Sequence, residues 1–231
     1  MNWGWIGANA ELIWGRVVEH VGLAVPPIVI GFLISIPLGY VASRSRVWRT
    51  VLVTTGNILF TIPSIALLVL VPVVLGRPLI DPVNVIVALT IYAVAIMVRS
   101  AADAFASVAG DVKQSATAIG YSRVQRFFRV ELPLAGPVLL AGVRVVSVST
   151  VSLVTIGAVV GIDSLGSFFT DAFQRQFLTE AIVGIVCVLV IAAVFDVILS
   201  LIGRILMPWR PRTVAPRPSW MRMPPPAQAV G

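Results

Sequence analysis

The sequence predicts an all-α integral membrane protein with about five transmembrane helices. Of its 231 residues, 58% are hydrophobic and only 12% are charged, and the mean hydropathy is +0.99. A soluble domain usually carries about 25% charged residues, so this chain has too little polar surface to cover a globule in water. Its hydrophobic residues gather into long uncharged stretches, and lipid cannot satisfy an open backbone. Helical spans are therefore expected, since the alternation typical of barrel strands is absent.

Five of these stretches are long enough to cross about 30 Å of hydrocarbon. The predicted spans lie within residues 19–44, 49–77, 81–99, 132–162 and 181–203. Three prolines predict a bend in the first span and two predict a bend in the second, because proline removes a helical hydrogen bond. These prolines are Pro26, Pro27, Pro37, Pro63 and Pro72.

The basic residues orient the chain in the membrane. Most of the 17 Lys and Arg residues fall in segments that face the cytoplasm if the N-terminus is outside. The positive-inside rule therefore predicts an outer N-terminus and an inner C-terminus. Three regions follow: an outer interfacial segment at 1–19, a transmembrane domain at 20–206, and a Pro- and Arg-rich tail at 207–231. Composition predicts a disordered cytoplasmic tail, with an ordered docking segment as the alternative.

Composition also disfavours several classes of function. Cys187 is the single cysteine, which excludes an internal disulfide, and one Cys with one His cannot form the usual kind of zinc site. We predict no metal site and no catalytic residue. The net charge of +7 and the pI of about 11.0 raise the question of nucleic-acid binding. The basic residues are dispersed between spans, however, so no nucleic-acid partner is expected.

The longest hydrophilic segment, residues 99–131, connects the third and fourth spans and predicts two short helices. Asp111 can cap a first helix over residues 112–119. Gly120 suits the left-handed conformation that often ends a helix. The loop therefore begins as a helix followed by a glycine turn.

The second short helix of this loop begins with a capping-box pattern, Ser122 followed three residues later by Gln125. Pro133 is well placed to open the fourth span. The helix carries arginines at every third position beside an apolar patch, and either lipid or a partner protein must cover such a patch. The arginines are Arg123, Arg126 and Arg129, and the patch is Val124, Phe127 and Phe128.

The string QSATAIGYSRVQRFFRVELPLAGP, residues 114–137, resembles the EAA loop of binding-protein-dependent ABC importer permeases. That pattern reads Glu-Ala-Ala, three residues, Gly, nine residues and Ile-x-Leu-Pro. The matching positions are Ala116, Gly120, Leu132 and Pro133, and the departures are Gln114, Ser115 and Val130. A match at this spacing, in an inner loop of a five-span protein, is a specific signal.

The resemblance extends over roughly residues 20–205 and narrows to the permease subunits of osmoprotectant importers. Segments 61–76, 88–100 and 141–168 are similar to that subfamily, which handles glycine betaine, carnitine, choline or proline betaine. A permease for another small solute, such as an amino acid, would share the same loop. An ion-coupled secondary transporter is the alternative from a different class, although a single membrane carboxylate and no visible inverted repeat disfavour it.

The resemblance implies a type I ABC importer permease fold in a bacterial cell membrane, with residues 20–206 as the permease domain. The implied partners are a cytoplasmic ABC ATPase dimer, a second permease subunit that is identical or paralogous, an extracytoplasmic substrate-binding protein and the lipid bilayer. No G-x-x-x-x-G-K-[ST] motif occurs in the chain. ATP and Mg²⁺ are therefore expected on the partner ATPase, and this chain is expected to hold no cofactor and to be no enzyme. The residues implied in ATPase coupling are Gln114, Ala116, Gly120, Tyr121, Arg123, Phe127, Leu132 and Pro133.

Three further residues inside the spans are candidates for packing or for the solute pathway. Gly157 and Gly161 form a G-x-x-x-G pattern that permits close helix contact, either within this chain or at a dimer or pathway surface. Tyr92 is an aromatic residue that could face a quaternary amine through a cation–π contact, or simply pack against neighbours.

Two charged residues inside spans are also candidates. Arg144 lies within snorkelling reach of the inner headgroups and is expected to bond to loop carbonyls or to a carboxylate. Asp196 is rare in such a position unless it is paired, protonated or facing water. Its alternatives are an ion pair with Arg144 or Arg204, a place in the pathway, and a proton-coupling role.

Overall fold

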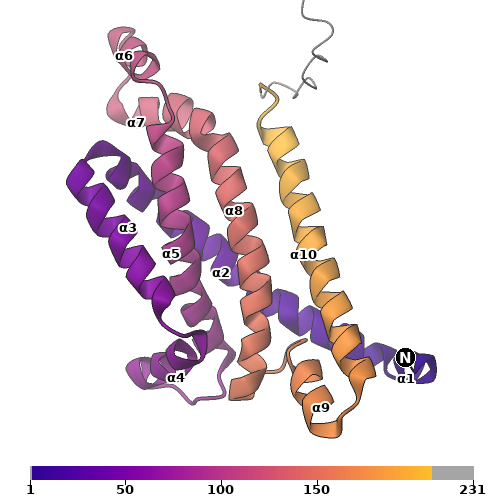
Figure 1. The fold of residues 1–231 in the computed structure, drawn as a ribbon. Coiled ribbons are helices and arrows are strands. Elements are labelled where there is room, and N and C mark those ends of the chain that lie inside the picture. Colours follow the sequence, from indigo (N-terminus) through magenta and orange to yellow (C-terminus); the bar gives the residue numbers. More distant parts are fainter. Residues whose placement is uncertain (1, 210–231) are drawn as a thin grey trace, which may run out of the picture.

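The computed structural model describes residues 2–209, in which every regular element is a helix (Figure 1). The α-helices are α1 (Trp3–Ala8), α2 (Ala10–Arg44), α3 (Arg46–Thr61), α4 (Ser64–Leu75), α5 (Pro82–Ala106), α6 (Gly110–Ala118), α7 (Arg123–Arg126), α8 (Leu132–Val154), α9 (Ser167–Arg175) and α10 (Leu178–Leu206). A π-helix, Phe127–Glu131, joins α7 to α8, and a 3₁₀-helix, Thr155–Val160, extends α8. Residues 210–231, most of the predicted tail, lie outside the described residues.

By length and composition, four continuous helical segments of the described chain can cross a membrane. They are α2, α5, the run Arg123–Val160 and α10. Helices α3 and α4 qualify together as a fifth span that is bent by 102° at a short break. The prediction of about five helical spans is therefore confirmed.

The break in the second span lies where Pro63 predicts it. Ile62 and Pro63 are extended, with ψ angles of 128° and 132°. A residue before proline is disfavoured in the α region, so Ile62 leaves the helix. Pro72, by contrast, lies inside α4.

The first and third spans differ from their predicted limits. Helix α2 begins at Ala10 and runs uninterrupted to Arg44 despite its three internal prolines, so the predicted boundary after residue 19 lies inside a helix. Helix α5 continues seven residues past the predicted limit at Arg99, to Ala106. It continues because its last turns are buried: Phe105 is 0% exposed. The exposed loop therefore begins at Ser107.

Helix α5 forms the centre of the bundle, and α2 packs against it through small residues. A Cβ atom on Gly31 would lie 2.5 Å from Cβ of Ala93, and one on Gly39 would lie 2.3 Å from Cβ of Ala101. Glycine and alanine at such positions let two helix backbones approach closely, which is the main source of packing energy between helices in lipid. The sequence analysis did not single out this α2–α5 seam.

The two ends of the bundle differ in character. Helices α6 and α7 lie together at one end, and α4 and α9 lie at the other (Figure 1). At the second end, Asp81 caps α5: its carboxylate accepts hydrogen bonds from the Val83 N–H at 2.9 Å and from Arg77 at 2.7 Å. These two bonds lower the pKa of Asp81 below its usual value. That the α6–α7 end faces the cytoplasm remains a prediction.

Candidate functional site

The candidate site is the connection between α5 and α8, which we call the coupling loop (residues 107–131). Its first part is tied to the end of α5. The ammonium group of Lys113 donates a hydrogen bond to the carbonyl oxygen of Phe105 at 3.0 Å, and the hydroxyl of Ser107 donates to that of Ala104 at 2.7 Å. The last carbonyls of a helix have no partner within it, so these two bonds cap α5. The Lys113 bond also holds α6 beside α5.

Helix α6 begins earlier than the sequence indicates. Its N-cap is Ala109, and Asp111 lies in the first turn with no capping hydrogen bond. The prediction that Asp111 caps this helix is therefore wrong. Its carboxylate still lies near the positive end of the helix dipole, where a negative charge is favourable.

The end of α6 is a Schellman motif centred on Gly120. Gly120 has a φ of +93°, which favours glycine. The N–H of Tyr121 donates to the carbonyl of Ala116 at 3.1 Å, and the N–H of Gly120 donates to that of Thr117 at 3.0 Å. This is the pair of bonds that defines the motif. The predicted glycine turn is confirmed, and Ala116 is the buried residue of α6.

The capping box predicted for α7 is also present. The Gln125 N–H donates to the Ser122 hydroxyl at 3.3 Å, and the Ser122 N–H donates to the Gln125 side-chain oxygen at 3.0 Å. Two backbone donors at the start of α7 are thus satisfied reciprocally. Because Ser122 follows the Gly120 turn almost directly, the direction change between α6 and α7 is fixed from both sides.

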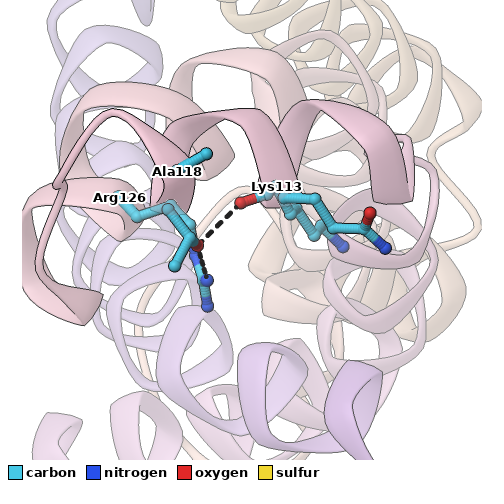
Figure 2. Close-up of a pocket in the computed structure, with 5 residues that line it drawn as sticks. Lys113, Ala118 and Arg126 are labelled. Carbon is cyan, nitrogen blue, oxygen red and sulfur yellow. Dashed lines mark hydrogen bonds between the residues drawn. The ribbon is translucent and has the colours of Figure 1, made fainter.

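An ion pair braces the last part of the coupling loop, directly before α8 begins. The Nε atom of Arg126 donates to a carboxylate oxygen of Glu131 at 2.8 Å, and Nη1 of Arg126 donates to the hydroxyl of Thr117 at 2.8 Å. Thr117 in turn donates to the carbonyl of Lys113 at 2.9 Å, which joins α6 to α7 (Figure 2). Through Arg126 the same network reaches Glu131 in the π-helix. Glu131 is 1% exposed, and a carboxylate so buried needs a cation.

The π-helix explains why Arg126 and Glu131 meet. These residues are five positions apart, a spacing that an α-helix does not place on one face. In the π-helix the Leu132 N–H bonds to the carbonyl of Phe127, five residues earlier. The wider turn adds one residue to the ladder and rotates Glu131 toward Arg126. The sequence analysis missed Glu131, and this unusual spacing was its only local signal.

An aromatic cluster supports the loop from the membrane side. The rings of Tyr40 and Phe127 lie 4.7 Å apart between centroids, and those of Phe105 and Phe127 lie 5.6 Å apart. Phe127 is therefore half-buried against α2 and α5, so the bundle itself covers part of the predicted apolar patch. Val124 and Phe128, at 66% and 62% exposed, are the exposed part of that patch.

The predicted coupling residues thus gather at one end of the bundle but divide into two sets. The exposed members are Gln114, Gly120 and Arg123, and the inward or half-buried members are Ala116, Tyr121, Phe127, Leu132 and Pro133. On the outer side, a shallow groove of about 420 Å³ lies between α6 and α7 (Figure 2). Its lining residues are Lys113, Gln114, Thr117, Ala118 and Arg126. One side of the loop therefore offers a polar, partly basic surface, while the other side is anchored in the bundle.

Arg144 and Asp196 form a bidentate ion pair between α8 and α10. The Nε and Nη2 atoms of Arg144 each donate to one carboxylate oxygen of Asp196 at 2.6 Å. Arg144 lies about 18 Å along α8, at about 1.5 Å per residue, which is near the middle of a bilayer about 30 Å thick. The predicted pairing of Asp196 with Arg144 is confirmed, and it neutralises both charges at membrane depth.

Gly157 and Gly161 do not form a helix-packing surface together. Gly157 is buried in the 3₁₀-helix, and a Cβ there would contact Val85 of α5 at 3.5 Å. Gly161 has a φ of +83° and ends the 3₁₀-helix, so it lies beyond any helix face. Within the described residues, Gly157 thus packs inside this chain and Gly161 serves as a turn residue.

Tyr92 is buried, and its hydroxyl donates a hydrogen bond to the carbonyl of Ile62. That carbonyl belongs to the break between α3 and α4, where helical bonding is interrupted. The ring packs edge-on against Phe60 at 5.8 Å. Tyr92 therefore stabilises the bent second span, and its hydroxyl is already engaged.

Two further polar contacts were not predicted. His20 is fully buried, with its Nε2 atom 3.0 Å from the carbonyl oxygen of Val151, so it links α2 to α8. Arg16 contacts Asp163 at 2.6 Å and links α2 to the segment after Gly161. Within residues 2–209, no group of three or more His, Cys, Asp or Glu side chains is placed to hold a metal ion.

The fold and the loop define a multi-pass helical membrane protein with a braced loop between two spans. Residues 31–210 match the family described as the inner membrane component of binding-protein-dependent transport systems, and the chain belongs to this family. It is therefore a permease subunit of a binding-protein-dependent ABC importer and resides in the bacterial inner membrane.

The similar proteins agree with this family. The choline transport system permease protein OpuBB of Bacillus subtilis is 29% identical over 203 residues, which are 87% of this chain and 90% of that protein. The osmoprotectant import permease protein OsmW of Salmonella typhimurium is 27% identical over 87% of this chain and 94% of that protein. The inward-facing MetNI methionine ABC transporter matches with a TM-score of 0.70 at 23% identity, over 91% of this chain and 100% of that chain. The predicted type I ABC importer permease fold is confirmed.

Proposed function

We propose that this permease serves an ATP-driven importer of osmoprotectants such as glycine betaine, carnitine, choline or proline betaine. The observation that carries the proposal is similarity over 87% of the chain to permeases named for choline and osmoprotectant transport. The similarity spans 90% and 94% of these two relatives, so it is not confined to the loop shared by other importers. The transported solute is thus a small zwitterion or cation with a quaternary ammonium group.

The coupling loop is the proposed contact with a cytoplasmic ABC ATPase dimer. Its polar outward side, with Gln114 and Gly120, is exposed, while the Lys113 bond to α5 and the packing of Phe127 fix the loop to the bundle. An ATPase that closes on ATP would pull this surface, and the bracing would pass the movement to α5 and α8. ATP and Mg²⁺ bind to the ATPase in this scheme, because the sequence lacks the phosphate-binding motif. This chain itself catalyses no reaction.

Two other partners complete the proposed importer. A second permease subunit, identical or paralogous, would share the solute pathway and cover part of the exposed apolar surface. That surface includes Val73 and Val74 of α4, which are 75% and 74% exposed. An extracytoplasmic substrate-binding protein would deliver the solute, and high-affinity selection would reside there. Tyr92 is bonded to the α3–α4 break, so the proposal does not require it as a solute ligand.

The first test is affinity purification of the tagged chain in mild detergent, with mass spectrometry of the retained proteins. We expect a Walker-A ATPase to be retained. ATP turnover by the complex, with its binding protein in a bilayer, should rise severalfold with glycine betaine or choline. Methionine at the same concentration is the control solute and should leave turnover unchanged. Stimulation by methionine alone would overturn the osmoprotectant assignment, and a chain that purifies stably without an ATPase would overturn the coupling assignment.

An ion-coupled secondary transporter is less compatible with the site. Its membrane carboxylate would have to titrate or release an ion, but Asp196 accepts two hydrogen bonds from Arg144. The Arg144 guanidinium occupies both carboxylate oxygens, so a transported cation would have to displace it. The ion pair thus supports the ATP-driven scheme.

A further inference from the structure

An apolar groove runs from the spanning helices to the coupling loop. Its membrane part, of about 590 Å³, lies between α2, α8 and α10, and its loop part, of about 660 Å³, lies between α2 and α7. The two parts are continuous because they share Leu33, Ile36 and Leu132. The membrane part is lined by apolar side chains and two glycines, and no charged residue lines it.

The open face of this groove is at the depth of lipid chains. Leu33 on α2 is 59% exposed and Leu206 on α10 is 65% exposed, and both helices are long and apolar enough to span a membrane. An occupant of the membrane part must therefore be apolar. Val124 and Phe128 of the coupling loop line or border the same groove and continue its apolar surface beyond the span.

The loop end of the groove is cationic. Arg44, the last residue of α2, and Arg123, the first residue of α7, both line it and both are exposed. Neither forms an ion pair with any residue in the range 2–209. The Arg44 guanidinium lies 5.2 Å from the centre of the Tyr40 ring and donates to its hydroxyl at 2.8 Å. Arg44 is thus held at the groove mouth with donors to spare, and a guanidinium fork suits a phosphate group.

We propose that this groove binds an anionic phospholipid, with the phosphate between Arg44 and Arg123 and an acyl chain along α2, α8 and α10. The two arginines select an anionic headgroup by charge complementarity. The apolar lining at membrane depth accommodates an acyl chain. The lipid would also cover Val124 and Phe128, leaving the opposite, polar side of the coupling loop for a protein partner. The inference requires the spanning fold alone and is independent of the transported solute.

The experiment uses the full chain, purified in mild detergent with whatever partners it retains. It is incubated with phosphatidylglycerol or phosphatidylcholine of identical acyl chains, and bound lipid is counted by native mass spectrometry. We expect at least about fivefold more retained phosphatidylglycerol than phosphatidylcholine, since each basic residue near an anionic lipid surface contributes measurably. Arg44→Gln and the double variant Arg44→Gln/Arg123→Gln should lose this preference in steps. Arg129→Gln is the matched control, because Arg129 is an exposed arginine of the same loop outside the groove lining.

Four outcomes would overturn the proposal. Equal retention of the two lipids would show that the groove does not select an anionic headgroup. A loss in Arg129→Gln as large as in Arg44→Gln would reduce the effect to general positive charge. Displacement of the lipid by millimolar glycerol 3-phosphate would mean a free-anion site without an acyl chain. Loss of a retained ATPase in Arg44→Gln, with lipid binding unchanged, would assign the groove to a protein. An unchanged elution volume and helical circular dichroism spectrum verify that each variant is folded.

Discussion

At the scale of single residues, Gly120 has the most specific backbone requirement in the coupling loop. Its φ of +93° costs about 1–2 kcal/mol for most L-residues, while asparagine tolerates positive φ better. A Cβ at this position would meet no heavy atom of this chain within 4 Å. A larger side chain would therefore project outward, into the space that a partner protein would occupy.

We predict that Gly120→Arg abolishes ATPase retention and transport while membrane insertion stays normal. The arginine side chain would obstruct the partner protein. It would not clash within this chain, because no heavy atom lies within 4 Å of a Cβ at this position. Gly120→Asn keeps the turn and should retain the ATPase at near wild-type amounts, and Gly120→Ala measures the backbone strain alone. Copurified ATPase per tagged chain is the measurement. Unimpaired uptake by Gly120→Arg would remove Gly120 from the proposed interface.

At the scale of helices, the seam between α2 and α5 decides how the bundle closes. Gly39 lies so close to Ala101 that an added Cβ would come within 2.3 Å of the alanine Cβ and 2.7 Å of its carbonyl carbon. Backbone cannot move aside as the end of a flexible side chain can, so the two helices would have to separate. Overpacking of this kind typically costs about 1–3 kcal/mol.

Gly39→Ala should therefore destabilise the protein, with a fall of several degrees in the Tm of the detergent-solubilised chain. Gly22→Ala is the matched control in the same helix, since a Cβ on Gly22 meets nothing within 4 Å. Replacing glycine by alanine in a helix interior is otherwise favourable by roughly 0.5–1 kcal/mol. The two variants should thus shift Tm in opposite directions. If the Gly39→Ala protein were as stable as the Gly22→Ala protein, the close packing of α2 against α5 at Gly39 would be contradicted.

At the scale of the whole molecule, the apolar interior of the bilayer makes an unpaired charge unfavourable. Arg144 and Asp196 lie near its middle, and removing one partner leaves an uncompensated charge in a low-dielectric medium. Removing both leaves an apolar contact between α8 and α10. A purely structural pair and a pair that lines the solute pathway respond differently to these two changes.

We predict that Asp196→Leu alone lowers the yield of folded protein roughly tenfold, because the Arg144 guanidinium loses its partner. The double variant Arg144→Met/Asp196→Leu should recover most of that yield. Solute uptake by the double variant is the deciding measurement: uptake near wild type identifies a structural pair, and folded protein without uptake identifies a pathway pair. A single variant that folds as well as wild type would contradict both.

The local rules of the sequence predicted several parts of this molecule that depend on neighbouring residues, although they placed the cap of α6 wrongly at Asp111. The turn at Gly120 and the capping box of Ser122 and Gln125 involve hydrogen bonds over three to five residues, so their patterns are visible in the sequence. The break at Pro63 follows from the sterics of the preceding residue. The spans followed from composition, and the pairing of Asp196 was one of the alternatives already in view.

The remaining features depend on contacts distant in sequence or on an unusual helical turn. Phe127 lies inward because Tyr40 and Phe105 provide a site for its ring, and neither is near it in sequence. Glu131 reaches Arg126 only because a π-helix replaces an α-turn. The close approach at Gly31 and Gly39 requires knowing that α2 faces α5, which periodicity in a uniformly apolar helix does not reveal.

The continuity of the chain after Gly120 has a mechanical consequence. Residues Arg123–Val160 form one continuous helical run of 38 residues, in which a π-helix joins α7 to α8 and a 3₁₀-helix follows α8. Helix α7 is the end of this run in the coupling loop (Figure 1). Gly161, with a φ of +83°, ends the run at the other side of the bundle. A movement of the coupling loop therefore reaches the opposite side of the bundle through one unbroken stretch of helical backbone. Helix α8 packs against α2, α5 and α10 along this path, so its movement displaces all three helices.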